Sequence, residues 1–134
     1  MFIPWTDDLL MGIAAIDRQH KWLVDATNQL HEEVSRPEPD RGAIFDLLMG
    51  LVEYTCTHFT AEEDVFQRFG YPDADGHRAQ HKAFAARINA LIDAHERGDN
   101  TSLEALEFLK QWLLHHILES DQAYAPFLKM RGAA

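Results

Sequence analysis

The chain has 134 residues, of which 46% are apolar and 25% are charged, proportions typical of one compact domain with a substantial core. Its 22 acidic residues outnumber the 12 basic ones, and the net charge of -10 is the wrong sign for a surface that binds nucleic acid or anionic lipid. The single cysteine, Cys56, excludes an intramolecular disulfide framework and a cysteine-rich zinc module. The unusual feature of the composition is its eight histidines.

The beginning of the chain carries no signal for membrane insertion or export. A membrane-spanning helix needs about 20 consecutive apolar residues. The longest apolar run, Leu9 to Ile16, has only eight. The first residues also lack the basic and then apolar order of a secretion signal. We therefore expect a cytoplasmic protein with no membrane insertion.

Proline and glycine residues divide the rest of the chain into four segments with helical periodicity. Pro37 and Pro39 form the first break, Gly70 with Pro72 the second, and Gly98 the third, because proline cannot continue a helix and glycine favours turns. The four predicted helices span about residues 17–36, 41–69, 74–96 and 102–129.

Residues that favour helix N-termini stand at the start of each segment. They are Asp17, Asp40, Asp73 or Asp75, and Thr101 at the head of a Thr-Ser-Leu-Glu capping box. Nothing alternates with a period of two over a useful length, so no strand is predicted. Short connections make consecutive helices antiparallel, and the expected fold is an all-α, up-down-up-down four-helix bundle of residues 17–129. Residues 1–16 would form an N-terminal arm, within a single domain of residues 1–134.

Each predicted helix carries a stripe of apolar residues with spacings of four and three, and each stripe is interrupted by histidine. The stripe of the second helix is Ile44, Leu48, Leu51, Thr55, His58, Glu62, Val65 and Phe69. The stripe of the fourth helix is Leu106, Leu109, Leu113, His116, Ser120, Ala123 and Phe127. Burying these polar side chains costs several kcal/mol for each one that lacks a partner, of the order of 2 to 7. Something must therefore compensate for them inside the bundle.

The spacing of these residues points to a metal site. His58 with Glu62, and His77 with His81, are separated by four residues, so each pair aims two donor groups at one point. At a rise of about 1.5 Å per residue, all four helices bring a ligand to the same level of the bundle. The remaining ligands would be His20 on the first helix, and His116 with Asp121 on the fourth.

Five imidazoles and two carboxylates are too many for one ion, so two metal ions are the economical interpretation. Nitrogen and carboxylate ligands without thiolate suit iron, manganese or zinc. If each histidine were instead satisfied individually in the core, their convergence on one level would be a coincidence. A zinc peptidase would carry His-Glu-x-x-His, and a ferritin-like oxidase Glu-x-x-His, and neither motif occurs in the chain.

The sequence resembles the hemerythrins, in particular the single-domain bacteriohemerythrins, over nearly its whole length. The segments that carry the resemblance are Trp5, Gly12-Ile13, residues 16–21, residues 58–63, Gly70-Tyr71-Pro72, His77 with His81, and residues 112–121. The resemblance implies a non-haem di-iron centre with an oxo or hydroxo bridge, at which O2 binds reversibly. It assigns His77, His81 and His116 to one iron, His20 and His58 to the other, and Glu62 and Asp121 as bridges. O2 would bind at an open position of the iron held by His20 and His58.

The fourth helix presents a geometric problem, because His116 and Asp121 are five residues apart, about 140° around a regular helix. Either Asp121 reaches across from the flank, or the helix contains a local π-type turn. His115 with Glu119 has the better spacing, but His115 lies off the apolar stripe. We therefore expect His116 to be the ligand.

The remaining histidines, His31, His95 and His115, are expected to lie outside the site. The favoured function is O2 storage, delivery or buffering by a monomer that is not an enzyme. The alternative is sensing or detoxification, in which the same centre responds to O2, nitric oxide or iron. A peroxide or nitric oxide reductase would need a proton donor at the open position, and Tyr54 and Thr55 are the polar candidates nearby.

Overall fold

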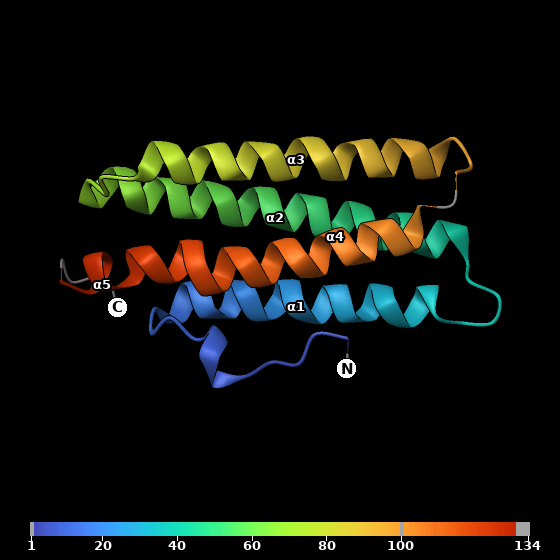
Figure 1. The fold of residues 1–134 in the computed structure, drawn as a ribbon, viewed down its shortest axis with the longest axis horizontal. Coiled ribbons are helices and arrows are strands. Elements are labelled where there is room, and N and C mark those ends of the chain that lie inside the picture. Colours follow the sequence, from blue (N-terminus) through green and yellow to red (C-terminus); the bar gives the residue numbers. More distant parts are fainter. Residues whose placement is uncertain (1, 100, 131–134) are drawn as a thin grey trace.

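The computed structural model describes residues 2–99 and 101–130, and it is a bundle of antiparallel helices (Figure 1). The first three helices are α1 (Ala14–Val34), α2 (Arg41–Phe69) and α3 (Ala74–Glu96). The fourth is continuous but changes its winding: α4 (Ser102–His115) leads into the π-helix η2 (His116–Asp121), which leads into α5 (Gln122–Met130). The described residues contain no strand, and the predicted all-α four-helix fold is confirmed.

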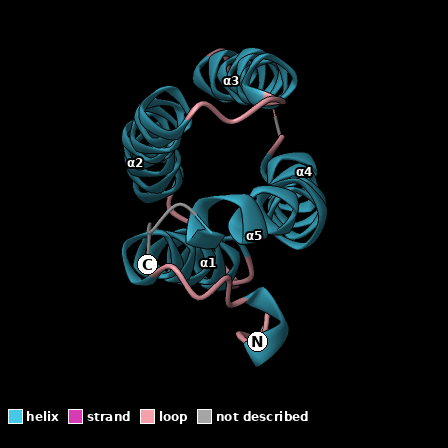
Figure 2. Ribbon diagram, turned by 90° about the vertical axis from the view of Figure 1, so that its left-hand side faces the viewer, coloured by secondary structure: helices cyan, strands magenta, loops and turns pink. Residues whose placement is uncertain are grey.

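The four helices surround a common axis, as the end-on view in Figure 2 shows. Along this cycle α1 packs on α2, α2 on α3, α3 on α4 and α4 on α1. The N-terminal arm, with its short turn η1 (Asp7–Leu9), runs back along α1. Two amide groups fasten the arm: Asn28 exchanges two hydrogen bonds with the backbone of Ile3, and Gln122 donates to the backbone oxygens of Asp8 and Leu10.

The first helix begins earlier than the sequence predicted. It starts at Ala14, with Ile13 in the capping position, and Asp17 lies in its first turn. The Asp17 carboxylate accepts hydrogen bonds from the backbone N–H groups of Met11 and Gly12, at 2.8 and 3.1 Å. The prediction that Asp17 is the N-cap was therefore wrong. Its side chain instead binds the backbone of the arm and fixes the arm to the first turn of the helix.

The other predicted caps have mixed outcomes. Asp40 is confirmed, since its side chain accepts hydrogen bonds from two backbone N–H groups in the first turn of α2. Asp73 and Thr101 occupy capping positions, but neither side chain makes a capping hydrogen bond. The Thr101 hydroxyl instead donates to the backbone oxygen of Leu91, at 3.3 Å, and so links the fourth helix to α3. Gly70 ends α2 in the left-handed region, with φ of 70°, where a residue without Cβ is favoured.

Two apolar clusters fill the bundle and leave a polar level between them. The larger cluster includes Leu23, Leu48 and Leu113, and the smaller one includes Phe66 and Leu128, towards the α2–α3 connection. Along α1, His20 lies between Ile16 of the smaller cluster and Leu23 of the larger one, and along the fourth helix His116 lies between Leu113 and Tyr124. The bundle thus encloses the polar residues with apolar packing above and below.

The predicted stripes are correct up to the polar level and wrong beyond it. In α2 the buried residue is Phe66, whereas Val65 and Phe69 are only half-buried. In the fourth helix the predicted Ala123 and Phe127 are replaced in the core by Tyr124 and Leu128, a displacement of one residue. The cause in the fourth helix is the π-helix, which accommodates an additional residue in its turn and rotates everything after it.

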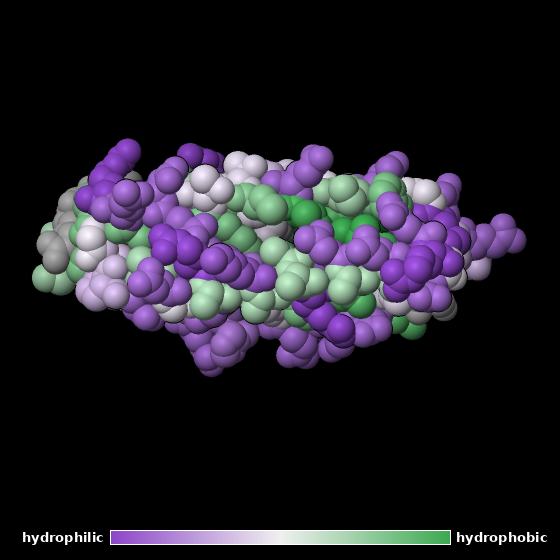
Figure 3. All heavy atoms as spheres, turned by 90° about the horizontal axis from the view of Figure 1, so that it is seen from above, coloured by the Kyte–Doolittle hydropathy of each residue, from purple (hydrophilic) through white to green (hydrophobic). Residues whose placement is uncertain are grey.

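The face of the bundle drawn in Figure 3 is predominantly hydrophilic. Figure 3 shows polar and charged residues over most of the face seen from above, with apolar residues exposed along its middle. None of the described helices combines the length and the apolar character needed to cross a membrane. Cys56 is exposed on α2.

Replacing Asp40 with alanine should destabilise the protein by about 0.5 to 2 kcal/mol, because two N–H groups at the start of α2 lose their acceptor. The free energy of unfolding can be measured by chemical denaturation followed by circular dichroism. Asp73→Ala is the matched control, since the Asp73 side chain makes no capping hydrogen bond, and its cost should be smaller. Equal costs for the two variants would contradict the capping role of Asp40.

Candidate metal centre

Seven polar side chains meet in one buried cluster at the middle level of the bundle. Each is exposed by 4% or less of its surface. The cluster consists of His20 from α1, His58 and Glu62 from α2, His77 and His81 from α3, and His116 and Asp121 from η2. These are the seven residues selected from the sequence, and the fold brings all of them together.

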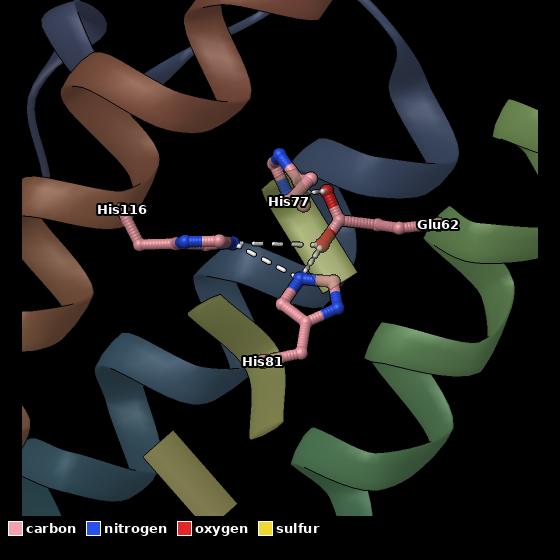
Figure 4. A group of neighbouring side chains, drawn as sticks. All are labelled: Glu62, His77, His81 and His116. Atoms are coloured by element: carbon pink, nitrogen blue, oxygen red, sulfur yellow. Dashed lines mark hydrogen bonds and ion pairs between the residues drawn. The ribbon is translucent and has the colours of Figure 1, made fainter. Parts of the chain in front are cut away.

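The first group within the cluster surrounds the Glu62 carboxylate, as Figure 4 shows. The Nε2 atoms of His81 and His116 lie 3.4 and 3.8 Å from Glu62 Oε1, and His77 Nε2 lies 3.7 Å from Oε2. The Nε2 atoms of His81 and His116 are 3.2 Å apart. Three imidazoles from two helices therefore point at one small volume beside the carboxylate.

The second group contains His20, His58, Glu62 and Asp121, and it shares Glu62 with the first. His58 Nε2 lies 3.0 Å from Glu62 Oε1, and His20 Nε2 lies 2.8 Å from Asp121 Oδ2. The ligand atoms within each group all lie within 4.8 Å of one another, so each group could hold a metal ion.

Asp121 also joins the two groups. Its Oδ2 atom faces His20, while its Oδ1 atom lies 2.8 Å from His77 Nε2 and 3.0 Å from His116 Nε2. Both carboxylates thus stand between the two sets of imidazoles. Carboxylates with one oxygen towards each of two sites are suited to bridging a pair of cations.

The π-helix is what allows the fourth helix to contribute two side chains. Residues 116 to 121 form one wide turn, so His116 and Asp121 lie one turn apart on the same face. Of the two geometries that the sequence left open, the π-type turn is correct. The competing pair, His115 and Glu119, forms an exposed ion pair with 64% and 70% of the side-chain surfaces accessible, away from the cluster.

The two carboxylates are held in their ionised form by the surrounding imidazoles. Burial raises the pKa of Glu62, but attraction to His58 and hydrogen bonds with His116, His58 and His77 outweigh it, so that the pKa lies well below its ordinary value. Burial and the negative charge of Glu62 would each raise the pKa of Asp121. Hydrogen bonds with the neighbouring histidines outweigh both and lower the pKa of Asp121 to about 2. The cluster consequently carries two negative charges in its interior.

The imidazoles respond unequally to this charge. Burial lowers the pKa of His77, but hydrogen bonds with Asp121 and Glu62 overcome it and raise the pKa to about 9. At His116, burial likewise lowers the pKa, but hydrogen bonds with Asp121 and Glu62 outweigh it, so the pKa is raised. Burial dominates at His81, where it lowers the pKa. A proton on His77 therefore offsets part of the carboxylate charge at neutral pH when no metal is bound.

The cluster has the unsatisfied polar atoms that a metal site requires. Among the described residues, nine buried side-chain atoms lack a well-aligned hydrogen bond, and eight of them belong to this cluster. They include both oxygens of Asp121, Glu62 Oε1, and the Nε2 atoms of His20, His58 and His77. Buried polar atoms are normally paired. Converging nitrogen and oxygen atoms that are not satisfied by well-aligned hydrogen bonds fit a bound divalent or trivalent cation.

Aromatic rings pack on two of the histidines. The Phe59 ring stacks on His81 with centroids 3.7 Å apart, and the Trp112 ring stacks on His116 at 4.3 Å. Phe59 was not selected from the sequence, because it immediately follows His58 and lies off the predicted stripe. These rings limit the movement of the two imidazoles.

Tyr124 was also missed. Its fully buried hydroxyl donates a hydrogen bond to Glu62 Oε2. Burial and the nearby carboxylates raise its pKa well above the ordinary value, so the phenol keeps its proton and remains a donor. The spacing of three residues from Asp121 would have indicated this position only if the π-helix had been assumed.

Two of the remaining histidines have structural contacts outside the cluster. His95 is buried at the opposite end of the bundle, where its Nε2 atom lies 3.1 Å from the backbone oxygen of Arg41. His31 stacks on Phe2 of the N-terminal arm, with ring centroids 4.4 Å apart. Neither belongs to either group of ligands.

Replacing Tyr124 with phenylalanine should destabilise the metal-free protein by about 1 to 3 kcal/mol, because a buried carboxylate loses its hydrogen-bond donor. Chemical denaturation in the presence of a chelator measures the effect. Tyr71→Phe is the control, since its hydroxyl makes no hydrogen bond with the described residues and its ring occupies the same apolar cluster. If Tyr71→Phe lowered the free energy of unfolding as much as Tyr124→Phe, the assigned hydrogen bond would be refuted.

Comparisons with known proteins agree with this arrangement. Residues 11–128 match the family described as hemerythrin HHE cation binding domain. A bacteriohemerythrin of Stenotrophomonas maltophilia is 35% identical over 95% of this chain and 82% of its own length. A bacteriohemerythrin of Pseudomonas aeruginosa is 33% identical over 91% of this chain and 78% of its own length.

Similarity extends to solved structures. A crystal structure of wild-type hemerythrin superimposes with a TM-score of 0.87 at 28% sequence identity, covering 96% of this chain and 98% of the other. The sequence match, the helical arrangement and the buried histidine and carboxylate cluster agree with one another. The chain therefore belongs to the hemerythrin family.

Proposed function

We propose that the protein binds O2 reversibly at a non-haem di-iron centre and serves in oxygen storage, delivery or buffering. The observation that carries the proposal is the pair of buried ligand groups that share Glu62. A cluster designed for a single ion would leave several of its imidazoles without a partner. Membership of the hemerythrin family and the named bacteriohemerythrin relatives favour iron as the metal and O2 as the ligand.

In this proposal the ligands divide unequally between two irons. His77, His81 and His116 would hold one iron, His20 and His58 would hold the other, and Glu62 and Asp121 would serve both. The positions of Glu62 between His58 and His81, and of Asp121 between His20 and His77, support this division. The group with two imidazoles offers fewer protein ligands, and an iron held there would be the one able to bind O2.

Reversible binding requires that the bound gas be kept from water and from proton donors. A pair of ferrous ions supplies the electrons for O2 binding, and the residues of this chain hold the metals, bridge them and exclude solvent. Leu23 and Leu113, each exposed by only 2%, belong to the apolar cluster that adjoins the polar level. Low water access slows the loss of the ferrous state, which favours binding over turnover.

The remaining expectations concern the context in which the protein works. We propose that the chain forms one hemerythrin domain, acts as a monomer in the cytoplasm, and releases O2 to an acceptor of unknown identity without catalysing a reaction. Sensing of O2, nitric oxide or iron through the same centre would use the same ligands.

Anaerobic reduction followed by O2 titration tests the function directly. Iron analysis should give two irons per chain, and the visible charge-transfer band should appear with O2 and disappear when O2 is removed, with one O2 bound per chain. His116→Ala should lose iron and the band, because it removes an imidazole that lies beside both carboxylates of the cluster. His115→Ala, at the neighbouring exposed position, should keep both.

Each contrary outcome has a definite meaning. Irreversible oxidation or steady consumption of O2 by the wild-type protein would favour an enzyme or a sensor. Loss of the band in His115→Ala, with the band retained in His116→Ala, would overturn the ligand assignment.

Iron affinity should fall as the pH decreases. The raised pKa of His77, about 9, means that this ring is protonated at neutral pH in the metal-free protein, and iron must displace the proton. Each proton released lowers the apparent affinity by roughly tenfold per pH unit below that pKa. Competition with a ferrous chelator between about pH 6.5 and 7.5 measures the slope. An affinity independent of pH over this range would contradict the site.

A further inference from the structure

Two glutamines hold the outer nitrogens of two cluster histidines. Gln19 Oε1 lies 2.5 Å from Nδ1 of His58, and Gln80 Oε1 lies 3.1 Å from Nδ1 of His116. Each contact crosses between helices, from α1 to α2 and from η2 to α3. In both cases the nitrogen is the one that faces away from the carboxylates.

The two glutamines occupy equivalent places in the sequence. Gln19 immediately precedes His20, and Gln80 immediately precedes His81. Each Gln-His pair therefore gives one imidazole to the cluster and one amide to the imidazole of a neighbouring helix. The rings that receive the amides, His58 and His116, come from different ligand groups, so each group has one ring held in this way.

Resting on the proposed di-iron function, we propose that Gln19 and Gln80 are positioning residues that fix the tautomer of His58 and His116 and keep the centre in its ferrous, O2-binding state.

The tautomer follows from the chemistry of the amide. An amide oxygen can only accept a hydrogen bond, so the facing Nδ1 atom must carry the proton. A neutral imidazole with its proton on Nδ1 presents the lone pair of Nε2, and Nε2 of His58 and of His116 points into the cluster. The glutamines thus orient each ring and select the nitrogen that can bind a metal.

The neutral charge of the amide is as important as its oxygen. A carboxylate in the same place would draw the Nδ1 proton more strongly, make the imidazole a better electron donor and stabilise ferric iron. The cluster already contains the charges of Glu62 and Asp121. An amide supplies the hydrogen bond without a third charge, and so favours the ferrous state.

The outer nitrogens of His81 and His20 make no hydrogen bond with the described residues. His81 Nδ1 lies 3.8 Å from Glu63, beyond hydrogen-bond distance. The Glu63 carboxylate is itself paired with Arg78 at 2.8 Å, which offsets its charge. Among the described residues, His20 Nδ1 has no hydrogen-bond partner. The described contacts therefore place no unneutralised carboxylate against the outer nitrogens of these two rings.

The two glutamines should differ in how strongly each affects its imidazole. Gln19 is half-buried, whereas Gln80 is exposed and water can replace it at His116. Gln19 also acts on His58, a ligand of the iron that would bind O2. Substitution of Gln19 should therefore have the larger effect.

Removal of the acceptor tests the positioning role. Gln19→Met and Gln80→Met keep most of the side-chain volume, and Gln29→Met on the exposed face of α1 is the control. Nitrogen-15 spectra of the zinc-loaded protein should show the Nδ1–H signal of His58 altered by Gln19→Met alone, and that of His116 by Gln80→Met alone. Ferrous affinity, measured by chelator competition, should fall about 10 to 100-fold for Gln19→Met, less for Gln80→Met, and remain unchanged for Gln29→Met.

Addition of charge tests the electronic role. Gln19→Glu retains an acceptor and so preserves the ring position even if Gln19→Met disturbs folding. It should shift the midpoint potential of the iron centre to lower values and accelerate oxidation to the ferric state. Gln29→Glu adds the same charge to the same helix at a distance and should leave both unchanged.

The results separate this inference from the proposed function. A wild-type protein that binds no iron pair or does not bind O2 reversibly refutes the function. If the wild type binds O2 reversibly while the Gln19 and Gln80 variants match Gln29→Met and Gln29→Glu in imidazole signals, ferrous affinity and potential, the positioning role is refuted.

Discussion

The structure depends on one constraint: seven polar side chains, two of them ionised carboxylates, must be buried at a single level of a helical bundle. Without a cation, burying them is costly, and protonated imidazoles offer only partial compensation. Apolar clusters on both sides exclude the water that would otherwise solvate these groups. The polar level therefore weakens the metal-free bundle and at the same time prepares it to bind metal, which couples metal loading to stability.

The π-helix in the fourth helix has two consequences that belong together. It brings Asp121 onto the same face as His116, and it rotates the following turns so that Tyr124 meets Glu62. A regular α-helix would supply one of the two ligands and expose Tyr124. The irregular winding thus completes the cluster and positions the donor that holds one of its carboxylates, which agrees with the frequent occurrence of π-turns at functional sites.

The residues around the cluster hold its side chains in place by different interactions. Phe59 and Trp112 restrict the imidazole rings through stacking, whereas Tyr124 fixes a carboxylate through a hydrogen bond. In our proposal, Gln19 and Gln80 fix the tautomers of His58 and His116. Packing limits where a ligand can move, and hydrogen bonding decides which of its atoms faces the metal.

The sequence by itself determined the all-α bundle and three of the four helix starts, and it selected the seven residues that the fold brings together. Local spacing accounts for the pairs His58 with Glu62 and His77 with His81, whereas His20, His116 and Asp121 also depended on the level of each helix and on the family resemblance. Pairs four residues apart share a helix face whatever the rest of the fold does, and Pro37 and Gly70 interrupt helices through their own backbone chemistry. Only the tertiary structure decided how the fourth helix winds, since an α-turn and a π-turn between His116 and Asp121 differ little locally. In the π-helical arrangement Asp121 faces His20 and His77 on two other helices, and Tyr124 meets Glu62 on a third. For the same reason, the contacts of Tyr124 and Gln19 became visible only once residues distant in sequence were placed side by side.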